Sequence, residues 1–213
     1  MPDPVKRTYD SSGRRHRAEE KRRAVLDTAA DLFAERGYRA TTMRAIAERA
    51  GVTAETIYTT IGTKPELFRL LVETSLSGTD DPVHVLERDY IREMAAEPDA
   101  EEKLRIYARA IGAIQRRMVP LYRAAREAAA HEPMLEQIWQ ELLERRARNM
   151  PLLLDALTPT GRVRPDLDRR RAADTVWAFN STEVYDLLTR VRGWSDGRYV
   201  EWLADLLVRE LLD

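Results

Sequence analysis

Cations and hydroxyl groups gather in one stretch of this 213-residue chain, residues 41–68. Arg44 carries a planar guanidinium that can donate two parallel hydrogen bonds to a single base edge. Thr42 and Thr53 stand where short helices are expected to begin, beside free backbone N–H groups, and Lys64 lies in the first turn of a further helix. Such groups suit phosphate oxygens and bases. The chemistry favoured here is recognition of a nucleic acid.

Chemistry that makes or breaks bonds finds little support in the sequence. The chain has no cysteine, and its three histidines, His16, His84 and His131, are far apart. Disulfides and thiolate catalysis are therefore excluded, and we expect no cofactor, no metal site and no enzyme activity. A helical-bundle enzyme using Glu183, Tyr185 or His131 as acid or base is an alternative, but no nucleophile or phosphate-loop pattern accompanies these residues.

Composition favours an all-α protein. Hydrophobic residues make up 44% of the chain and charged residues 33%, with many Ala, Leu, Glu and Arg. The sequence has no apolar run of about 18 residues, and charges stand where a signal peptide would be apolar, so we expect a cytoplasmic protein that does not enter a membrane. Residues 1–68 hold 13 Lys and Arg against 10 Asp and Glu, a modest basic bias that supports a nucleic-acid surface only beside a motif.

Hydrophobic periodicity and turn residues divide the chain into expected elements. We expect a flexible basic arm over residues 1–16, a DNA-binding domain with its connecting helix over 17–76, and a larger helical bundle over 77–213. About nine to ten helices are predicted, with Pro151 bending one of them. Their expected ranges are 17–36, 42–50, 53–61, 63–76, 85–96, 101–118, 120–130, 134–157, 168–192 and 197–212.

The two short helices of residues 42–61 each separate an apolar face from a polar face. At about 100° per residue, Ile46 and Ile57 point inward, whereas Arg44, Glu55 and Thr59 point outward. Small hydroxyl side chains allow the close approach that a DNA major groove requires. The sequence therefore predicts a helix-turn-helix with an outward reading face.

Residues 17–71 resemble the N-terminal domain of the TetR family of bacterial transcriptional repressors. The family pattern T-x-x-x-I-A-x-x-A-G-V, followed by T-[LI]-Y-x-[YH]-F-x-[ST]-K-x-x-L, is matched here by Thr42, Ile46, Ala47, Ala50, Gly51, Val52, Thr56, Ile57, Tyr58, Thr63, Lys64 and Leu67. Two positions depart: Thr60 stands where Tyr or His is usual, and Ile61 where Phe is usual. The resemblance implies an all-α helix-turn-helix domain followed by a ligand-binding and dimerisation bundle.

The predicted DNA contacts combine the reading face with the resemblance. They are Thr42, Arg44, Thr53, Ala54, Glu55, Thr56, Tyr58, Thr59, Thr60 and Lys64. Glu55 would repel phosphates unless it accepts a hydrogen bond from a cytosine amine. A helix-turn-helix used only for packing is the alternative, and Tyr58 could be a core residue. The basic side chains of the N-terminal segment could follow DNA or form a solvated tail; they are Arg14, Arg15, Arg17, Lys21, Arg22 and Arg23.

The bundle helices carry apolar stripes interrupted by single polar residues, which is how small-molecule sites are lined. Each such residue could equally belong to an ordinary core, but the resemblance implies that an inducer binds in this bundle. Arg146 and Asn149 also fall within such a stripe, and Arg146 hints at an acidic ligand. The predicted pocket residues are Tyr107, Ile111, Gln115, Met118, Tyr122, Trp139, Trp177 and Asn180.

The last two predicted helices are apolar around much of their circumference, so one face needs a partner. A homodimer through these helices is expected, and two recognition helices would then read a pseudo-palindromic operator in double-stranded DNA. The leading hypothesis is a repressor released by a small-molecule effector, with the helix beginning at Thr63 as the lever. A dimeric DNA-binding protein without an effector is the alternative.

Overall fold

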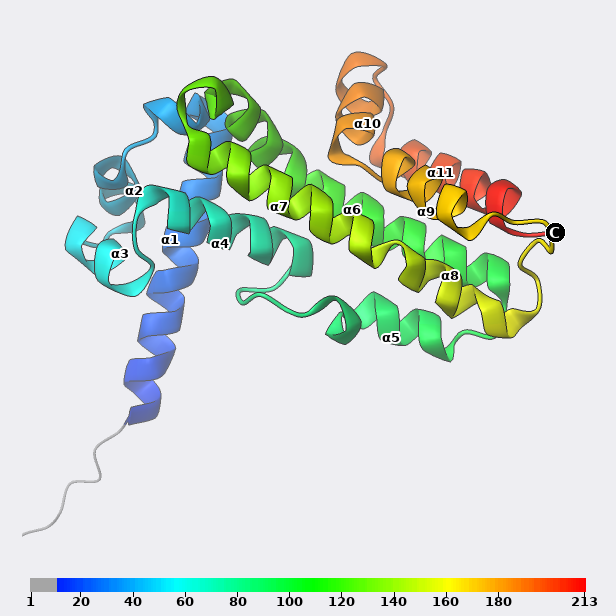
Figure 1. Cartoon of the computed structure of the whole chain (residues 1–213). Helices are drawn as coiled ribbons and strands as arrows, with labels where there is room; N and C mark the ends of the chain where they lie inside the picture. Colours follow the sequence, from blue (N-terminus) through cyan, green and yellow to red (C-terminus); the bar gives the residue numbers. More distant parts are fainter. Residues whose placement is uncertain (1–10) are drawn as a thin grey trace, which may run out of the picture.

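The computed structural model describes residues 11–213, and within them the chain is helical with no β-sheet, as predicted. Figure 1 shows α1 to α4 gathered at one end and α9 to α11 at the other. The helices are α1 (Ser11–Ala40), α2 (Met43–Ala50), α3 (Ala54–Thr60), α4 (Lys64–Ser77), α5 (Asp89–Ala96), α6 (Ala100–Ala128), α7 (Pro133–Asn149), α8 (Pro151–Leu157), α9 (Arg169–Phe179), α10 (Thr182–Asp186) and α11 (Asp196–Leu211).

The head, as we call α1 to α4, is held by a small aromatic cluster. The rings of Phe33 and Tyr38 stack at 5.4 Å between centroids, and Phe68 of α4 meets Tyr38 edge-on at 5.5 Å. Gly37 interrupts α1 with a φ of 73°, and the buried Thr41 hydroxyl donates to the Gly37 carbonyl at 2.9 Å. The end of α1 is thereby turned back so that α2 can pack on it.

The bundle, α5 to α11, is built along α6. This helix contacts α1 and α4 of the head and runs on to pack against α11 (Figure 1). Gly112 permits the close approach of α11, because a Cβ added there would lie 2.4 Å from Val200 Cγ2. One continuous helix therefore touches both the head and the far end of the bundle. In the described residues no helix is long and apolar enough to span a bilayer.

Several predicted helix boundaries were wrong. The first helix begins at Ser11 rather than Arg17, so only residues 1–10 of the predicted arm lie outside the described part of the chain. The predicted helices 101–118 and 120–130 form the single helix α6, which continues through Pro120 because burial along one side outweighs the lost backbone hydrogen bond.

Two other predicted helices are divided. The helix expected over 134–157 is two, α7 and α8, since Pro151 begins a new helix after Met150 instead of bending one. The helix expected over 168–192 stops at Asn180. Ser181 then caps α10 by accepting from the Val184 N–H, and a π-helical turn, Leu187–Val191, follows.

Candidate nucleic-acid interface and effector cavity

The turn between α2 and α3 is fixed by two threonine caps and one glycine. Thr42 Oγ1 accepts from the Ala45 N–H at 3.1 Å, and Thr53 Oγ1 accepts from the Thr56 N–H at 3.1 Å. Between them Gly51 takes a left-handed φ of 69°, which closes α2. These local interactions set α3 across α2 as a helix-turn-helix. Both predicted threonines thus cap the N-termini of these helices.

The predicted reading residues lie on the surface of the head. Thr42, Thr53, Glu55, Thr59 and Thr60 are exposed, and Ala54 and Thr56 are half-buried. Tyr58 is 52% exposed, so it is not a core residue, whereas Ile57 beside it is fully buried. The inward and outward faces of α3 therefore follow the predicted division.

Hydroxyl groups on α3 already donate to its own backbone. Thr59 Oγ1 donates to the Glu55 carbonyl at 2.9 Å and Thr60 Oγ1 to the Thr56 carbonyl at 2.6 Å. Each oxygen then presents only lone pairs outward, which suits donors on bases. To bind a phosphate as a donor, either hydroxyl must first release its backbone bond.

Arg44 stands clear of the head surface. Its side chain is 86% exposed and its Nε donates to Glu48 Oε1 at 2.8 Å. That hydrogen bond raises the pKa of the guanidinium, so Arg44 is charged at any physiological pH. An exposed pair of this kind is weak and can open when a better acceptor arrives.

Lys64 lies at the first turn of α4, but it is less free than predicted. Its Nζ lies 4.0 Å from the centre of the Tyr38 ring, and burial lowers its pKa while Glu132 partly offsets this. Glu66 accepts from the Thr63 N–H at 2.7 Å and from the Thr63 hydroxyl at 2.8 Å, which fixes the start of α4. The ammonium is thus held over the Tyr38 ring.

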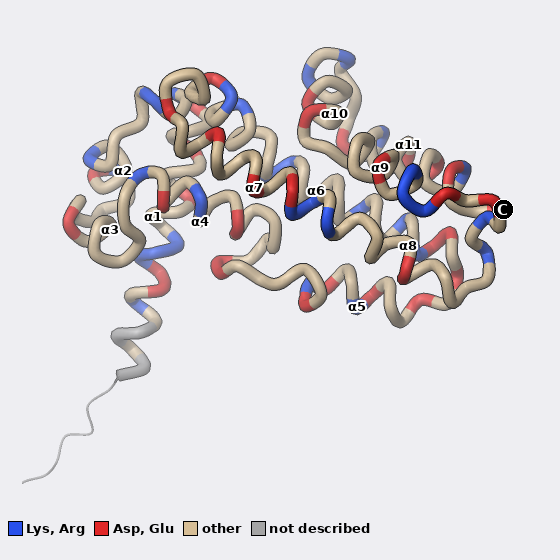
Figure 2. Tube along the Cα trace, viewed as in Figure 1, with Lys and Arg blue, Asp and Glu red and all other residues tan. Residues whose placement is uncertain are grey.

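Charge on the head is mixed. Figure 2 shows basic and acidic positions interspersed along α1 to α4, without one continuous basic stripe. Arg49, for example, is paired with Glu35 at 2.8 Å. Selection of a DNA sequence would therefore rest on the α2 and α3 contacts more than on a broad basic field.

A cavity of about 230 Å³ lies inside the bundle, between α5, α6, α7, α8 and α10. Five predicted pocket residues line it: Tyr107, Ile111, Gln115, Met118 and Asn180. Its remaining wall includes Leu76 of α4, Leu86 beside α5, and two arginines, Arg88 and Arg146. The cavity therefore reaches the last turns of the connecting helix.

Three predicted pocket residues lie elsewhere. Tyr122 and Trp139, whose ring centroids are 5.1 Å apart, line a second cavity with Arg126. Trp177 is not part of the main cavity wall, but its carbonyl accepts from Arg146 Nη2 at 2.9 Å. The position of a residue along an apolar stripe did not reveal which of the two cavities it lines.

Residues Arg88, Tyr90 and Met94 line the cavity and were not predicted to do so. Their element, residues 85–96, was predicted only as a short helix. Burial raises the pKa of Tyr90, and the Arg88 guanidinium beside it partly offsets this. The four-residue spacing of Tyr90 and Met94 on one helix face was the available signal.

Asn180 is the centre of a buried hydrogen-bond network. Its Nδ2 donates to the Tyr107 hydroxyl at 2.6 Å and its Oδ1 accepts from Arg146 Nη2 at 2.5 Å. Its carbonyl accepts from Gln115 Nε2 at 2.5 Å, and Gln115 Oε1 accepts from Thr182 at 2.7 Å. The break between α9 and α10 is therefore joined to α6 and α7 through one residue.

The connecting helix α4 is attached to the bundle by polar contacts. Glu73 accepts from Arg145 Nη1 of α7 at 2.9 Å, and the Ser75 carbonyl accepts from Arg117 Nε of α6 at 2.8 Å. Arg145 directly precedes the cavity residue Arg146. A shift of α7 would therefore change both the cavity wall and the contact between α7 and α4.

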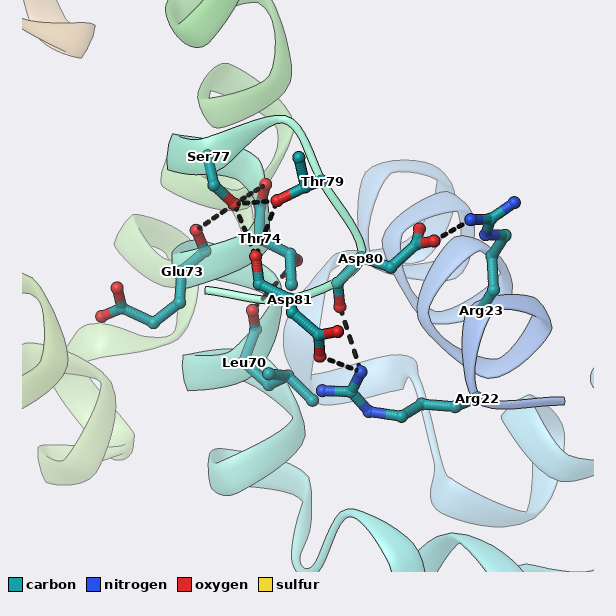
Figure 3. Close-up of polar contacts among 9 residues, drawn as sticks. All are labelled: Arg22, Arg23, Leu70, Glu73, Thr74, Ser77, Thr79, Asp80 and Asp81. Atoms are coloured by element: carbon teal, nitrogen blue, oxygen red, sulfur yellow. Dashed lines mark hydrogen bonds and ion pairs between the residues drawn. The ribbon is translucent and has the colours of Figure 1, made fainter. Parts of the chain in front are cut away.

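A second attachment, which we call the clasp, joins α1 to the loop after α4 (Figure 3). Arg22 Nη1 donates to Asp81 Oδ1 at 2.6 Å, and Arg23 is paired with Asp80. Thr79 Oγ1 donates to the Asp81 carbonyl at 2.7 Å and shapes the loop. Two arginines predicted as possible DNA contacts are thus engaged with the segment that leads into the cavity wall.

Comparison with known proteins agrees with this geometry. A helix-turn-helix joined through a connecting helix to a helical bundle with an internal cavity is the architecture of transcriptional regulators that respond to a small molecule. The family model of the bacterial regulatory proteins of the tetR family matches residues 25–71. The transcriptional repressor KstR2 of Mycobacterium tuberculosis is 30% identical over 163 residues, which cover 74% of this chain and 78% of that protein. The chain belongs to the TetR family.

Other similar proteins match this chain either over a short segment of sequence or in the overall fold. KstR2 of Rhodococcus jostii is 47% identical over 57 residues, 27% of this chain and 24% of that protein. The fatty acid degradation regulator FadR from Bacillus halodurans has a TM-score of 0.65 at 21% identity, over 88% of this chain and 94% of its own. SmeT in its complex with triclosan has a TM-score of 0.67 at 17% identity, over 91% and 92% of the two chains.

Proposed function

We propose that this protein is a repressor that binds an operator as a homodimer and leaves it when a small molecule occupies the bundle cavity. The observation that carries the proposal is that α4, which follows the recognition helix α3, reaches the cavity wall at Leu76. Related proteins support it, since KstR2 is a transcriptional repressor and SmeT forms a complex with triclosan.

In this proposal the outward residues of α2 and α3 contact DNA. Arg44 leaves Glu48 to bind a guanine, and the N–H groups behind Thr42 and Thr53 bind phosphates. The other proposed contacts are Ala54, Glu55, Thr56, Tyr58, Thr59, Thr60 and Lys64. Of these, Lys64 is proposed as a phosphate contact that keeps its position on Tyr38.

The homodimer is proposed through α9, α10 and α11. Phe179 and Trp202 meet at 5.8 Å between ring centroids and are half-buried, while Leu187 and Val191 are 54% and 56% exposed. Apolar surface of this kind is costly in water and is usually covered by a second subunit. Leu187→Glu should give a monomer in analytical ultracentrifugation, and Met134→Glu, at an exposed apolar residue of α7, should leave the dimer intact.

Release requires that the effector bind one bundle conformation better than the other. Movement of α7 or α5 around a ligand would pass to α4 through Arg145 and Glu73 and through the cavity residue Leu76. The two heads would then no longer match operator half-sites about one DNA turn apart.

The test of this function is fluorescence anisotropy with DNA fragments from around the protein's own gene at fixed salt. We expect one fragment to bind much more tightly than random DNA. Arg44→Ala should weaken that binding about tenfold to a hundredfold, as expected for a lost bidentate base contact. The control is Arg148→Ala, an exposed arginine of α7. Equal affinity for all fragments would contradict the proposal.

A further inference from the structure

The polar part of the cavity wall is cationic. Among the residues that line it, Arg88 and Arg146 are charged, and none is an aspartate or glutamate. The other polar side chains of the wall are neutral: Tyr90, Tyr107, Gln115, Asn149, Asn180 and Thr182. Two positively charged residues therefore line a largely apolar space that has no carboxylate among its lining residues.

Arg146 differs from its neighbours on α7 in having no ion pair within the described residues. Arg145 is paired with Glu73 and Arg148 with Glu144, whereas Arg146 bonds only to the Trp177 carbonyl and the Asn180 amide oxygen. Both of these bonds leave from Nη2, so Nε and Nη1 have no protein acceptor in residues 11–213.

Burial acts against the Arg146 charge. It lowers the pKa of the guanidinium, and Glu183 of α10 offsets this only at longer range. The Trp177 ring, 5.6 Å from the guanidinium carbon, gives some compensation. A partly buried cation without a counter-ion is costly, and an anion placed in the cavity would relieve that cost.

Arg88 supplies a second, independent observation. Its Nε is buried and has no hydrogen-bond partner in the described part of the protein. Arg88 precedes α5 and Arg146 lies on α7, so the two cations of the wall come from different elements. The buried Nε has no surface that a ligand in the cavity could reach, so Arg88 would attract an anion through its charge.

The rest of the wall is apolar. Ile111, Ile114 and Met118 of α6 face Leu142 and Leu153 across the space. The cavity volume of about 230 Å³ is near the lower end of the range found for small-molecule sites, so the space suits a small organic molecule. Such walls bind a hydrocarbon or ring system in preference to a sugar or a free inorganic ion.

We propose that the effector is an amphipathic organic anion, with a carboxylate that binds Arg146 and an apolar body that packs against α6 and α8, while Arg88 adds positive charge to the cavity wall. This inference rests on the proposed function of the cavity as the effector site. Arg146 would keep the bonds from Nη2 to Asn180 and the Trp177 carbonyl, and the carboxylate would accept one charge-assisted hydrogen bond from Nη1 or from Nε, which lie on different edges of the guanidinium. The ligand would thereby touch the Asn180 network.

The first test compares three ten-carbon probes on the full-length protein by isothermal titration calorimetry. Decanoate, 1-decanol and decylamine share an apolar chain and differ in their head group. Decanoate should bind about tenfold or more tightly than 1-decanol, and decylamine should bind most weakly. Equal binding of acid and alcohol would overturn the proposal, as would failure of decanoate and shorter carboxylates to bind at all.

The second test changes the cavity. Arg146→Gln keeps a donor for Asn180 but removes the charge, and it should weaken decanoate binding about tenfold while leaving 1-decanol binding unchanged. Arg88→Gln should give a smaller loss in the same direction, and Arg148→Gln, on the exposed side of α7, should give none. Unchanged decanoate affinity in both cavity variants would show that the anion site is elsewhere. The comparison of probes on the unmodified protein stands even if a variant fails to fold.

DNA binding separates this inference from the proposed function. If the protein selects a DNA fragment but decanoate neither binds nor releases it, the anionic effector is wrong and the DNA-binding function stands. If decanoate binds through Arg146 but no fragment is selected, the carboxylate site stands and the repressor function is wrong.

Discussion

The head and the bundle are stabilised by contacts of different sequence range. In the head, the caps of α2, α3 and α4 join residues three positions apart, such as Thr53 with Thr56 and Thr63 with Glu66. In the bundle, Asn180 bonds to Tyr107, 73 positions away, and to Arg146, 34 positions away. Local caps specify the start of each helix that reads DNA, whereas distant contacts specify the cavity. The two regions should therefore respond separately to substitution.

All four tryptophans of the chain, Trp139, Trp177, Trp194 and Trp202, lie in the bundle. Intrinsic fluorescence therefore follows the bundle, while hydrogen exchange of residues 41–68 follows the head. These two measurements can be made on the same variant.

The largest effect is expected for Asn180→Ala. The substitution leaves the Tyr107 hydroxyl and Arg146 Nη2 without their side-chain partner, and each buried unsatisfied group costs about 1–3 kcal/mol. We expect a loss of about 3 kcal/mol in the free energy of unfolding, measured by the tryptophan fluorescence transition in urea.

The matched control is Asn149→Ala, because Asn149 lines the same cavity and makes none of the side-chain hydrogen bonds in the described residues. It should change stability by less than about 0.5 kcal/mol. Equal losses in the two variants would show that the network contributes little beyond the volume of one side chain.

Gly62→Ala should act on the head instead. Gly62 has a φ of 114°, and an added Cβ would lie 2.3 Å from Glu66 Oε2, so the carboxylate would have to leave Thr63. Backbone strain and the lost cap together should cost about 2 kcal/mol. We expect faster hydrogen exchange over residues 41–68 with little change in the fluorescence transition.

Gly197→Ala is the control for this substitution, because its added Cβ meets no neighbouring atom within 4 Å and its φ is not positive. It should leave exchange in the head unchanged. A fluorescence shift for Gly62→Ala as large as that for Asn180→Ala would mean that head and bundle unfold as one unit.

The distance in sequence between interacting residues explains which features of the structure could be predicted from the sequence. Thr42, Gly51 and Thr53 stand at fixed short spacings, so the family, the all-α fold and the outward face of α3 followed from the sequence. The division at Asn180 did not, because it depends on partners from α6 and α7. Tyr122 and Trp139 share the stripe pattern of Tyr107, and only the packing of α6 on α7 shows that they face another cavity.

Acid should weaken the bundle through Asp186. Its side chain is only 7% exposed; burial alone would raise its pKa, but hydrogen bonds from Arg190 and Arg123 outweigh this and lower it. A lowered folded-state pKa means that the carboxylate stabilises the protein above about pH 4 and loses this contribution as the pH falls further. Asp186→Asn should cost about 1–2 kcal/mol at pH 7 and less at pH 3, measured by urea unfolding. A loss of equal size at both pH values would contradict the assignment.

The clasp crosses between the two regions and should have the smallest effect on stability. Arg23, Asp80 and Asp81 are exposed and Arg22 is half-buried, so Asp80→Asn with Asp81→Asn should lower the free energy of unfolding by less than about 1 kcal/mol. The coupling between decanoate binding and DNA binding should change more than the stability, because the clasp joins α1 to the loop that connects the cavity residues Leu76 and Val85. We expect the ratio of decanoate affinities without and with DNA to move toward one in the double variant, and also at high salt. Asp89→Asn, which removes an exposed pair within α5, should leave the ratio unchanged. If the double variant also leaves it unchanged, communication runs through α4 alone.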